Sequence, residues 1–293
     1  MKILLTGKTG QVGYELERTL QGLGEIVALD RQQMDLANLD QVRDVIRSVK
    51  PQLIINPAAY TAVDLAESAP DLAMRINADA PGVMAAEAKK LGAAMIHYST
   101  DYVFDGDKAE SYTEEDVPHP QSVYGRSKLA GEQAIQAAGI PHLILRTSWI
   151  YGLRGKNFLL TVQRLAQERD ELRIVADQFG APTWSRTLAE VTAHAICQLQ
   201  GGGTQANVDH AAWSAHSGLY HVTAQGRTSW HGFTQAIIAH SSGLKQPKVT
   251  PIATQDYPLP AKRPQNSVLS SQRFMQAFCR LPEWEAALKL CVD

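Results

Sequence analysis

The chain has 293 residues, with a hydrophobic fraction of 44%, a charged fraction of 20% and a formal net charge of −2. These values are typical of a soluble globular protein with one large α/β unit or two domains that share an interface. No block of lysine and arginine stands out, so neither nucleic acid nor an anionic membrane is expected as a partner.

The three cysteines, Cys197, Cys279 and Cys291, form neither a disulfide framework nor a CxxC metal motif, which is typical of a reducing compartment. The apolar run at the start is too short for a signal peptide, and no stretch reaches the roughly 18 apolar residues of a membrane span. We therefore expect a cytoplasmic protein.

The N-terminal residues predict a strand, a glycine-rich turn and a helix. Residues 3–5 are apolar, Gly7, Gly10 and Gly13 follow at once, and residues 14–20 have helical periodicity. Glycines let a dinucleotide pyrophosphate approach the backbone, and the helix N-terminus offers it free N–H groups. A simple glycine turn is the alternative, but its place directly after an N-terminal strand favours a cofactor site.

The next predicted strand, residues 26–29, ends in Asp30 and Arg31, which lie shortly after the last glycine. A carboxylate at this distance binds the ribose hydroxyls of NAD, whereas a basic neighbour accepts the 2′-phosphate of NADP. Asp30 favours NADH and Arg31 is compatible with NADPH, so both cofactors stay open.

A helix is predicted over residues 39–49 and a third strand over residues 53–55. Small residues follow this strand at Ala58 and Ala59, where they let a nicotinamide ribose lie close to the backbone; a turn signalled by the preceding Asn-Pro pair is an equal alternative. Residues 71–91 then predict one long helix, bent at Pro81.

The fourth predicted strand, residues 94–98, leads into Ser99, Thr100 and Asp101. Polar groups at the carboxyl end of a parallel strand point into the crevice where ligands bind. Capping of the next turn is the alternative for the two hydroxyls. A polar loop over residues 105–121 follows.

Tyr124 and Lys128 lie four residues apart, so a helix places both side chains on one face. A lysine ammonium beside a phenol stabilises the phenolate, which suits the tyrosine to proton transfer near neutral pH. Taken alone the spacing is weak, because tyrosine and lysine often lie four apart by chance.

The second half predicts a further strand over residues 142–145, helices over residues 158–169 and 187–199, and a strand over residues 219–222. The helix over residues 229–240 has Ser229 as its predicted N-cap, residues 249–260 are predicted to be extended, and two helices over residues 271–278 and 284–292 close the chain. Residues 201–216 predict a long loop, whose three consecutive glycines indicate mobility. Its His210 and His216 lack partners for a metal.

These motifs, in this order, resemble the extended short-chain dehydrogenase/reductase superfamily. Within it the chain is most similar to the dTDP-4-dehydrorhamnose reductase family, because similar stretches continue beyond the cofactor half at residues 146–149, 177–183 and 263–267. The resemblance covers nearly the full chain. It implies a Rossmann-type doubly wound parallel sheet with a smaller, partly interleaved α/β C-terminal substrate domain.

The implied division is a dinucleotide-binding domain over residues 1–147, which also receives part of residues 184–222, and a discontinuous substrate-binding domain over residues 148–293. The implied reaction belongs to dTDP-rhamnose biosynthesis: NADPH or NADH reduces the 4-keto group of a dTDP-linked deoxyhexulose to give dTDP-L-rhamnose. Tyr124 would protonate the new alkoxide, Thr100 would bind the same oxygen, and Lys128 would hold the nicotinamide ribose and lower the Tyr124 pKa.

Three sets of site residues follow. The catalytic set is Tyr124, Lys128 and Thr100. The cofactor-binding set is Gly7, Gly10, Gln11, Val12, Gly13, Asp30, Arg31, Asp35, Leu36, Ala58, Ala59, Tyr60, Thr61, Tyr98, Tyr124 and Lys128. The substrate-binding set is Thr100, Asp101, Trp149, Gln178 and Arg263.

The resemblance also implies a homodimer and a Mg²⁺ ion bound by acidic residues at the dimer interface, for which Glu15 and Glu190 are candidates; plain surface glutamates are the alternative. Two other functions on the same scaffold stay open. One is a nucleotide-sugar epimerase or dehydratase, which keeps its cofactor through the cycle. The other is a non-catalytic, regulatory NADP-binding subunit, although such a protein tends to lose the acid that Tyr124 would supply.

Overall fold

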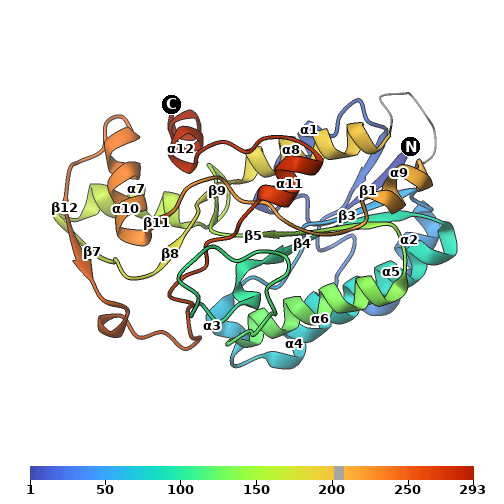
Figure 1. Cartoon of the computed structure of the whole chain (residues 1–293), viewed down its shortest axis with the longest axis horizontal. Coiled ribbons are helices and arrows are strands. Elements are labelled where there is room, and N and C mark those ends of the chain that lie inside the picture. The colour runs from blue at the N-terminus through green and yellow to red at the C-terminus, as the bar shows by residue number, and fades with distance from the viewer. Residues whose placement is uncertain (201–207) are drawn as a thin grey trace.

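A parallel six-stranded sheet forms the centre of the computed structural model, which describes residues 1–200 and 208–293 (Figure 1). Its strand order is β10-β5-β4-β3-β1-β2. The strands are β1 (Lys2–Leu5), β2 (Glu25–Ala28), β3 (Leu53–Asn56), β4 (Ala94–Thr100), β5 (His142–Thr147) and β10 (Gly218–His221). The chain extends the sheet from β1 to one side with β2 and to the other with β3, β4 and β5. This switch between β1 and β3 is where ligands bind in doubly wound sheets, and the predicted Rossmann-type fold class is confirmed.

Helices cover both faces of the sheet (Figure 1). One face carries α1 (Gln11–Thr19), α8 (Ser185–Leu199) and α11 (Gln272–Ala277), and the other carries α2 (Leu39–Val49), α5 (Ala80–Leu91) and α6 (Val123–Ala138). Successive strand side chains alternate between the two cores: Ile3 and Leu5 enter the first, and Leu4 enters the second. Two buried faces explain why these strands are continuously apolar.

A third hydrophobic core lies in the second half of the chain. There β7 (Glu171–Val175) pairs in parallel with β12 (Lys248–Ile252), next to α7 (Phe158–Glu168), α10 (Trp230–His240) and α12 (Trp284–Val292). Four short strands, β6 (Ile150–Tyr151), β8 (Phe179–Gly180), β9 (Thr183–Trp184) and β11 (Thr228–Ser229), connect this region to the sheet. In contrast, α8 and β10 pack on the central sheet although they come late in the chain.

The predicted long helix over residues 71–91 is interrupted before Pro81. It consists of α4 (Pro70–Met74), a π-helical turn at Arg75–Asp79, and α5. Pro81 has no N–H, so the carbonyl of Asn77 loses its usual partner four residues on. Gly131 of α6 packs against this carbonyl, where an added Cβ would lie 2.1 Å from the oxygen. The irregular turn therefore lets α6 approach closely.

Part of the predicted loop over residues 201–216 is a helix. Residues 201–207, with the three glycines, lie outside the described residues, but α9 (His210–Ala215) follows them. Asp209 caps α9 by accepting hydrogen bonds from the amides of Ala211 and Ala212, and Trp213 anchors it in the core. The remaining short elements are α3 (Val63–Ala66) and the 3-10 turns Asp101–Val103 and Thr254–Asp256. Within residues 1–200 and 208–293, none of the helices has the length and apolar character needed to cross a membrane.

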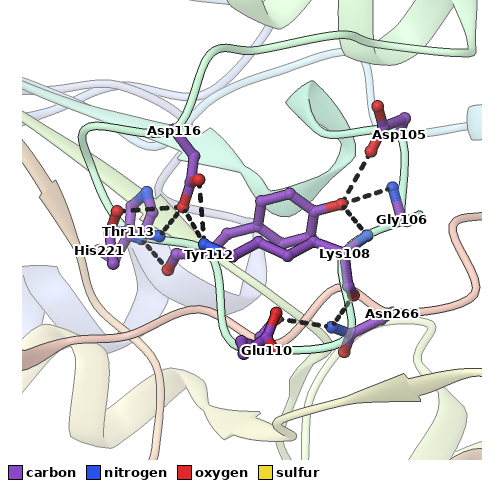
Figure 2. A network of polar contacts seen from close by, with 9 residues as sticks. All are labelled: Asp105, Gly106, Lys108, Glu110, Tyr112, Thr113, Asp116, His221 and Asn266. Carbon is purple, nitrogen blue, oxygen red and sulfur yellow. Dashed lines mark hydrogen bonds and ion pairs between the residues drawn. The ribbon is translucent and has the colours of Figure 1, made fainter.

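Hydrogen bonds and ion pairs of side chains hold the polar loop over residues 105–121 (Figure 2). Tyr112 lies at its centre, stacked on Phe104 with ring centroids 4.2 Å apart. The Tyr112 hydroxyl donates to Asp105 at 2.8 Å and accepts from the amides of Gly106 and Lys108. The second half of the chain closes the loop, since Asn266 donates to the carbonyls of Lys108 and Glu110. These contacts hold the loop in one conformation just before α6, the helix that carries Tyr124.

We expect the Tyr112→Phe variant to lose about 1–3 kcal/mol of unfolding free energy, because two buried amides and one carboxylate lose their partner. Urea denaturation of the variant and the wild type measures this loss. Tyr257→Phe, at an exposed tyrosine, is the matched control. Equal effects of the two substitutions would show that the Tyr112 network does not hold the loop.

Candidate active site

A cavity of about 710 Å³ opens at the carboxyl ends of the central strands. The segments that follow β1, β3, β4 and β5 all contribute to its wall, together with the start of α6. It therefore lies at the strand-order switch, the place that the sequence predicts for a ligand.

The glycine turn after β1 forms one end of the cavity. Gly7 has φ +61°, and an added Cβ would lie 2.9 Å from the Cβ of Ala58. A Cβ on Gly13 would lie 2.1 Å from the carbonyl oxygen of Gly7. Gly10 is the N-cap of α1 and no side chain caps the helix, so the first amides of α1 are available to an anion. This end fits a dinucleotide pyrophosphate.

Asp30 and Arg31 differ in how they face the cavity. One Asp30 carboxylate oxygen, Oδ1, accepts from the amides of Gln32 and Gln33 at 2.9 and 3.2 Å, so it holds its own turn. The Lys8 ammonium lies 3.9 Å from the other oxygen. Arg31 lines the cavity and lies 3.6 Å from Asp35. Two positive side chains, Arg31 at the cavity and Lys8 beside Asp30, thus lie near the position predicted for the cofactor ribose.

The predicted catalytic residues meet on the wall of this cavity. Ser122 begins α6 as its N-cap by accepting from the Gly125 amide at 3.1 Å. Tyr124 therefore lies in the first turn and Lys128 one turn later. Thr100, the last residue of β4, lies beside the Tyr124 phenol, and its hydroxyl favours the ionised phenol. The spacing in the sequence becomes a spatial cluster because α6 starts beside the end of β4.

The predicted effect of Lys128 on the Tyr124 pKa is not found. Burial raises the pKa of Tyr124 to about 12, an effect that the neighbouring Thr100 hydroxyl offsets only in part, and the nearby Asp101 charge raises the pKa further. The Lys128 Nζ points elsewhere: it donates to the Tyr98 carbonyl at 2.6 Å and lies 3.1 Å from His97 Nε2. Burial also lowers the pKa of Lys128 to about 8.

A buried ion pair supports Lys128 on the same face of the sheet. Glu132, one helical turn after Lys128, accepts two hydrogen bonds from Arg146 of β5 at 2.9 and 2.6 Å. Its negative charge favours the ammonium of Lys128 and partly opposes the effect of burial on the Lys128 pKa. The sequence analysis missed Glu132, although its i,i+4 spacing from Lys128 was a usable signal.

Asp101 is buried directly after Thr100, whose hydroxyl donates to it at 3.0 Å. Burial raises the pKa of Asp101 to about 6, against the lowering effect of the Ser267 and Thr100 hydroxyls. The second carboxylate oxygen, Oδ2, is buried and has no hydrogen-bond partner among the described residues. The Asp101 carboxyl is thus easier to protonate than an exposed aspartate.

Trp149 forms the wall at the second half of the chain. Its φ is +47°, and its ring stacks on Trp230 with centroids 3.5 Å apart. Gly180 leaves room for the ring, because an added Cβ would lie 2.5 Å from Trp149 Cε2. Gln178 accepts from the Trp230 indole at 3.2 Å and donates to Thr254 at 3.1 Å. Gln178 therefore positions the aromatic stack from behind and does not line the cavity.

Arg263 also lies outside the cavity wall. Its guanidinium makes a bidentate ion pair with Asp64 of α3 at 3.0 and 2.8 Å, and Asp64 accepts from the Ala261 amide as well. The ion pair ties the C-terminal segment to α3 beside Tyr102, whose ring centroid is 5.9 Å from the guanidinium carbon. Arg263 is thus close to the cavity, but its guanidinium is already paired with Asp64.

Most predicted site residues line the cavity. Those that do are Gly7, Gly10, Gln11, Val12, Gly13, Arg31, Asp35, Leu36, Ala58, Ala59, Tyr60, Thr61, Tyr98, Thr100, Asp101, Tyr124, Lys128 and Trp149. Asp30, Gln178 and Arg263 are outside it, and their binding roles stay predictions. Tyr98 lines the cavity, but its hydroxyl is hydrogen-bonded to Thr192 of α8 at 2.8 Å, on the face of the sheet opposite α6.

Three contributors escaped the sequence analysis. Lys156 lines the cavity, and its place in a short glycine-containing loop was the only signal. Asn157 caps α7 and also donates to Gln11 of the glycine turn at 2.8 Å. Asn77 bonds the backbone of Tyr60 and the hydroxyl of Ser127, so it joins the segment after β3 to α6. Contacts between distant segments leave no local pattern.

The candidate Mg²⁺ ligands do not form a site. Among the residues that the structure describes, no group of three or more histidine, cysteine, aspartate or glutamate side chains could hold a metal. Glu190 accepts from Arg186 at 2.8 Å, and this cation also feels the charge of Glu15. Within one chain Glu190 is thus paired with Arg186, and a Mg²⁺ ion at a dimer interface stays a prediction.

Comparisons with known proteins match the whole chain. The family model described as RmlD substrate binding domain matches residues 1–293. The dTDP-4-dehydrorhamnose reductase of Burkholderia thailandensis is 48% identical over 299 residues, with 100% of this chain and 98% of the relative covered. That of Escherichia coli K12 is 44% identical, with coverages of 99% and 96%.

Two solved structures with the same enzyme name are also similar. A dTDP-4-dehydrorhamnose reductase of Clostridium acetobutylicum has a TM-score of 0.90 at 39% identity and covers 100% of this chain and 99% of its own. A dTDP-4-dehydrorhamnose reductase of Bacillus anthracis, solved in complex with NADP, has a TM-score of 0.88 at 34% identity, with coverages of 99% and 98%.

We expect Glu132→Gln to cost about 3–5 kcal/mol of unfolding free energy, because Arg146 is left as a buried charge without its counter-ion. The double variant Glu132→Leu with Arg146→Met should recover most of this loss. Glu168→Gln, in an exposed pair with Arg164, is the control and should change stability by about 0.5 kcal/mol or less. Denaturant unfolding measures all three. A Glu132→Gln cost as small as that of the control would contradict the buried pair.

Proposed function

We propose that this chain, which belongs to the dTDP-4-dehydrorhamnose reductase family, uses NAD(P)H to reduce the 4-keto group of dTDP-4-dehydro-6-deoxy-L-mannose to dTDP-L-rhamnose. The observation that carries the proposal is the meeting of Thr100, Tyr124 and Lys128 on the wall of the cavity that the glycine turn after β1 also lines. A reductase needs a proton donor and a cation beside its hydride source, and this cavity holds both.

When bound, the nicotinamide supplies the hydride for the reduction. A tyrosine phenol is protonated at neutral pH, and burial raises the Tyr124 pKa further, so the phenol is available to donate a proton to the alkoxide oxygen that the reduction creates. Thr100 lies beside the phenol and would give the same oxygen a second hydrogen bond once its hydroxyl turns from Asp101. Trp149 covers the opposite wall and helps exclude water from the substrate. Lys128 contributes a positive charge one helical turn below Tyr124.

The surroundings of Arg31 support NADPH as an accepted cofactor. The Asp30 carboxylate is partly used by its own turn, whereas Arg31 reaches the cavity and Lys8 lies near it. A guanidinium suits a 2′-phosphate, and the Bacillus anthracis relative binds NADP. We propose that NADPH binds at least as well as NADH.

We also propose the division expected from the sequence: residues 1–147 with part of 184–222 bind the dinucleotide, and the rest of 148–293 forms the substrate domain. The packing of α8 and β10 on the central sheet supports this interleaving. The family resemblance also supports the proposal that the protein is a homodimer. The three cysteines form no disulfide, which supports a place in the reducing cytoplasm. Sedimentation equilibrium measures the oligomeric state.

We expect the purified protein to oxidise NADPH in proportion to the dTDP-4-keto sugar supplied. Tyr124→Phe should lower kcat by about 10²–10⁴-fold, because the proton donor is lost, while Tyr257→Phe should not change it. The decrease in NADPH absorbance measures both. A Tyr124→Phe variant as fast as the wild type would refute the role of Tyr124. Conversion of the sugar with no net NADPH oxidation would instead indicate an epimerase or dehydratase, and binding without any conversion a regulatory subunit.

Arg263 is proposed to bind the substrate diphosphate, and a second pair of variants separates this role from its ion pair with Asp64. If Arg263 contacts the diphosphate, Arg263→Met should raise KM for the dTDP-sugar by about tenfold or more, the effect of one lost charge-assisted hydrogen bond. Asp64→Asn should then raise KM much less, because it leaves the guanidinium in place. Equal KM changes in both variants would show that Arg263 only ties α3 to the C-terminal segment.

A further inference from the structure

A chain of buried polar side chains leads from Lys128 across the sheet and away from the cavity. Lys128 Nζ lies 3.1 Å from His97 Nε2, and His97 Nδ1 lies 3.1 Å from the side-chain amide of Asn56. The other end of this amide contacts the Thr6 hydroxyl at 2.6 Å. These side chains are all at most 2% exposed. Of the four residues, only Lys128 has a role in the proposed function.

The register of the sheet creates this chain. Asn56 of β3 pairs directly with His97 of β4, and both side chains point to the face covered by α6. Thr6 follows β1 on the same face, next to Asn56. Neighbouring parallel strands thus present three polar residues in a row at their carboxyl ends, and Lys128 reaches down from α6 to meet them.

The proton pattern of the chain has two self-consistent states. An ammonium only donates, so a charged Lys128 requires His97 Nε2 to accept and Nδ1 to carry the ring proton. In the structure the Asn56 NH₂ group faces Nδ1 and its oxygen accepts from Thr6, and in this orientation Nδ1 accepts, Nε2–H donates, and Lys128 must be neutral. The state with a charged Lys128 requires the amide to rotate by half a turn, which brings its oxygen to Nδ1 and its NH₂ group to Thr6 and exchanges only the oxygen and nitrogen positions. Deprotonation of Lys128 is therefore coupled to a tautomer change and an amide rotation.

The charges around Lys128 favour the first state. Glu132 of α6 favours the ammonium and shares its charge with Arg146 of β5. Tyr124 of α6 is neutral, as a phenol is at neutral pH, and burial and Asp101 after β4 both raise its pKa further. His97 adds no competing charge, since burial and Lys128 together hold its pKa well below the usual value. Tyr98 offers only a carbonyl acceptor.

We propose that His97 is a positioning residue for the reduction: as a neutral imidazole held by Asn56 and Thr6, it accepts a hydrogen bond from Lys128 and keeps this lysine charged and fixed in its place at the cavity wall. The inference rests on the proposed function, since it acts through the role of Lys128. It concerns residues that do not touch substrate or cofactor, and it predicts a definite tautomer.

The tautomer can be measured without any activity. Long-range ¹H–¹⁵N correlation spectra of the whole protein, assigned with His97→Gln, report which ring nitrogen carries the proton. We expect His97 to be neutral with the proton on Nδ1 at pH 7. A proton on Nε2, or a doubly protonated ring, would overturn the inference.

Two substitutions then test the consequence for catalysis. His97→Leu removes the acceptor for Lys128, whereas the amide oxygen of His97→Gln can replace Nε2. We expect His97→Leu to lower kcat/KM by about tenfold or more, the loss of one hydrogen bond to a charged group. The basic limb of its pH profile should also move to lower pH, because the ammonium is less stabilised. His97→Gln should retain kcat/KM within about threefold and keep the limb in place.

His221→Leu is the matched control, since His221 is equally buried on the same sheet face and contacts the Tyr112 carbonyl rather than Lys128. Thermal unfolding of each variant ensures that folded protein is compared. A His97→Leu profile with the same basic limb as wild type and His221→Leu would overturn the positioning role. If the wild type does not oxidise NADPH, the proposed function fails, while the tautomer measurement still decides the proton pattern.

Discussion

The burial of the Lys128 ammonium is the constraint on which the active face of the sheet depends. A buried charge is costly unless it is paired and hydrogen-bonded, and Lys128 finds the Tyr98 carbonyl and His97 within 3.1 Å. Glu132 supplies a negative charge one turn away, and Arg146 in turn balances Glu132. The carboxyl ends of the strands under α6 are therefore polar, although the rest of each strand is apolar.

The irregular features around α6 follow from the need to bring this helix close. The π-helical turn before Pro81 leaves the Asn77 carbonyl exposed to Gly131, and the Asn77 side chain bonds Ser127 of α6. Gly125 lies against the Tyr102 carbonyl, where a Cβ would come within 2.1 Å. Close approach places Tyr124 beside Thr100. The position of Tyr124, the proposed proton donor, is thus set by close backbone contacts at glycines and not by charged side chains.

Side chains at the junction of the two halves of the chain complete the cavity. Trp149 stacks on Trp230, Gln178 holds the Trp230 indole, and Arg263 ties the C-terminal segment to α3. The loop around Tyr112 adds a further connection, because Asn266 from the C-terminal segment donates a hydrogen bond to it. Each of these contacts joins segments far apart in the sequence, so the cavity depends on how the halves pack and not on any single motif.

The sequence by itself determined the elements and the class of site. The glycine turn after an apolar strand, the polar ends of strands, and the spacing of Tyr124 and Lys128 are local patterns, because they arise from backbone geometry and helical periodicity. Helix α2 matches its predicted bounds for the same reason. The family resemblance then indicated the substrate.

Only the tertiary structure decided which side chains are engaged elsewhere. Tyr98 points to α8, Asp30 binds its own turn, and Arg263 is paired with Asp64. The raised pKa of Tyr124 likewise comes from burial, which depends on every segment that covers the phenol. Burial, charge balance and hydrogen-bond partners are properties of the packed chain, and for that reason the contacts of His97 with Lys128 and of Glu132 with Arg146 were revealed only by the packing of β4, β5 and α6.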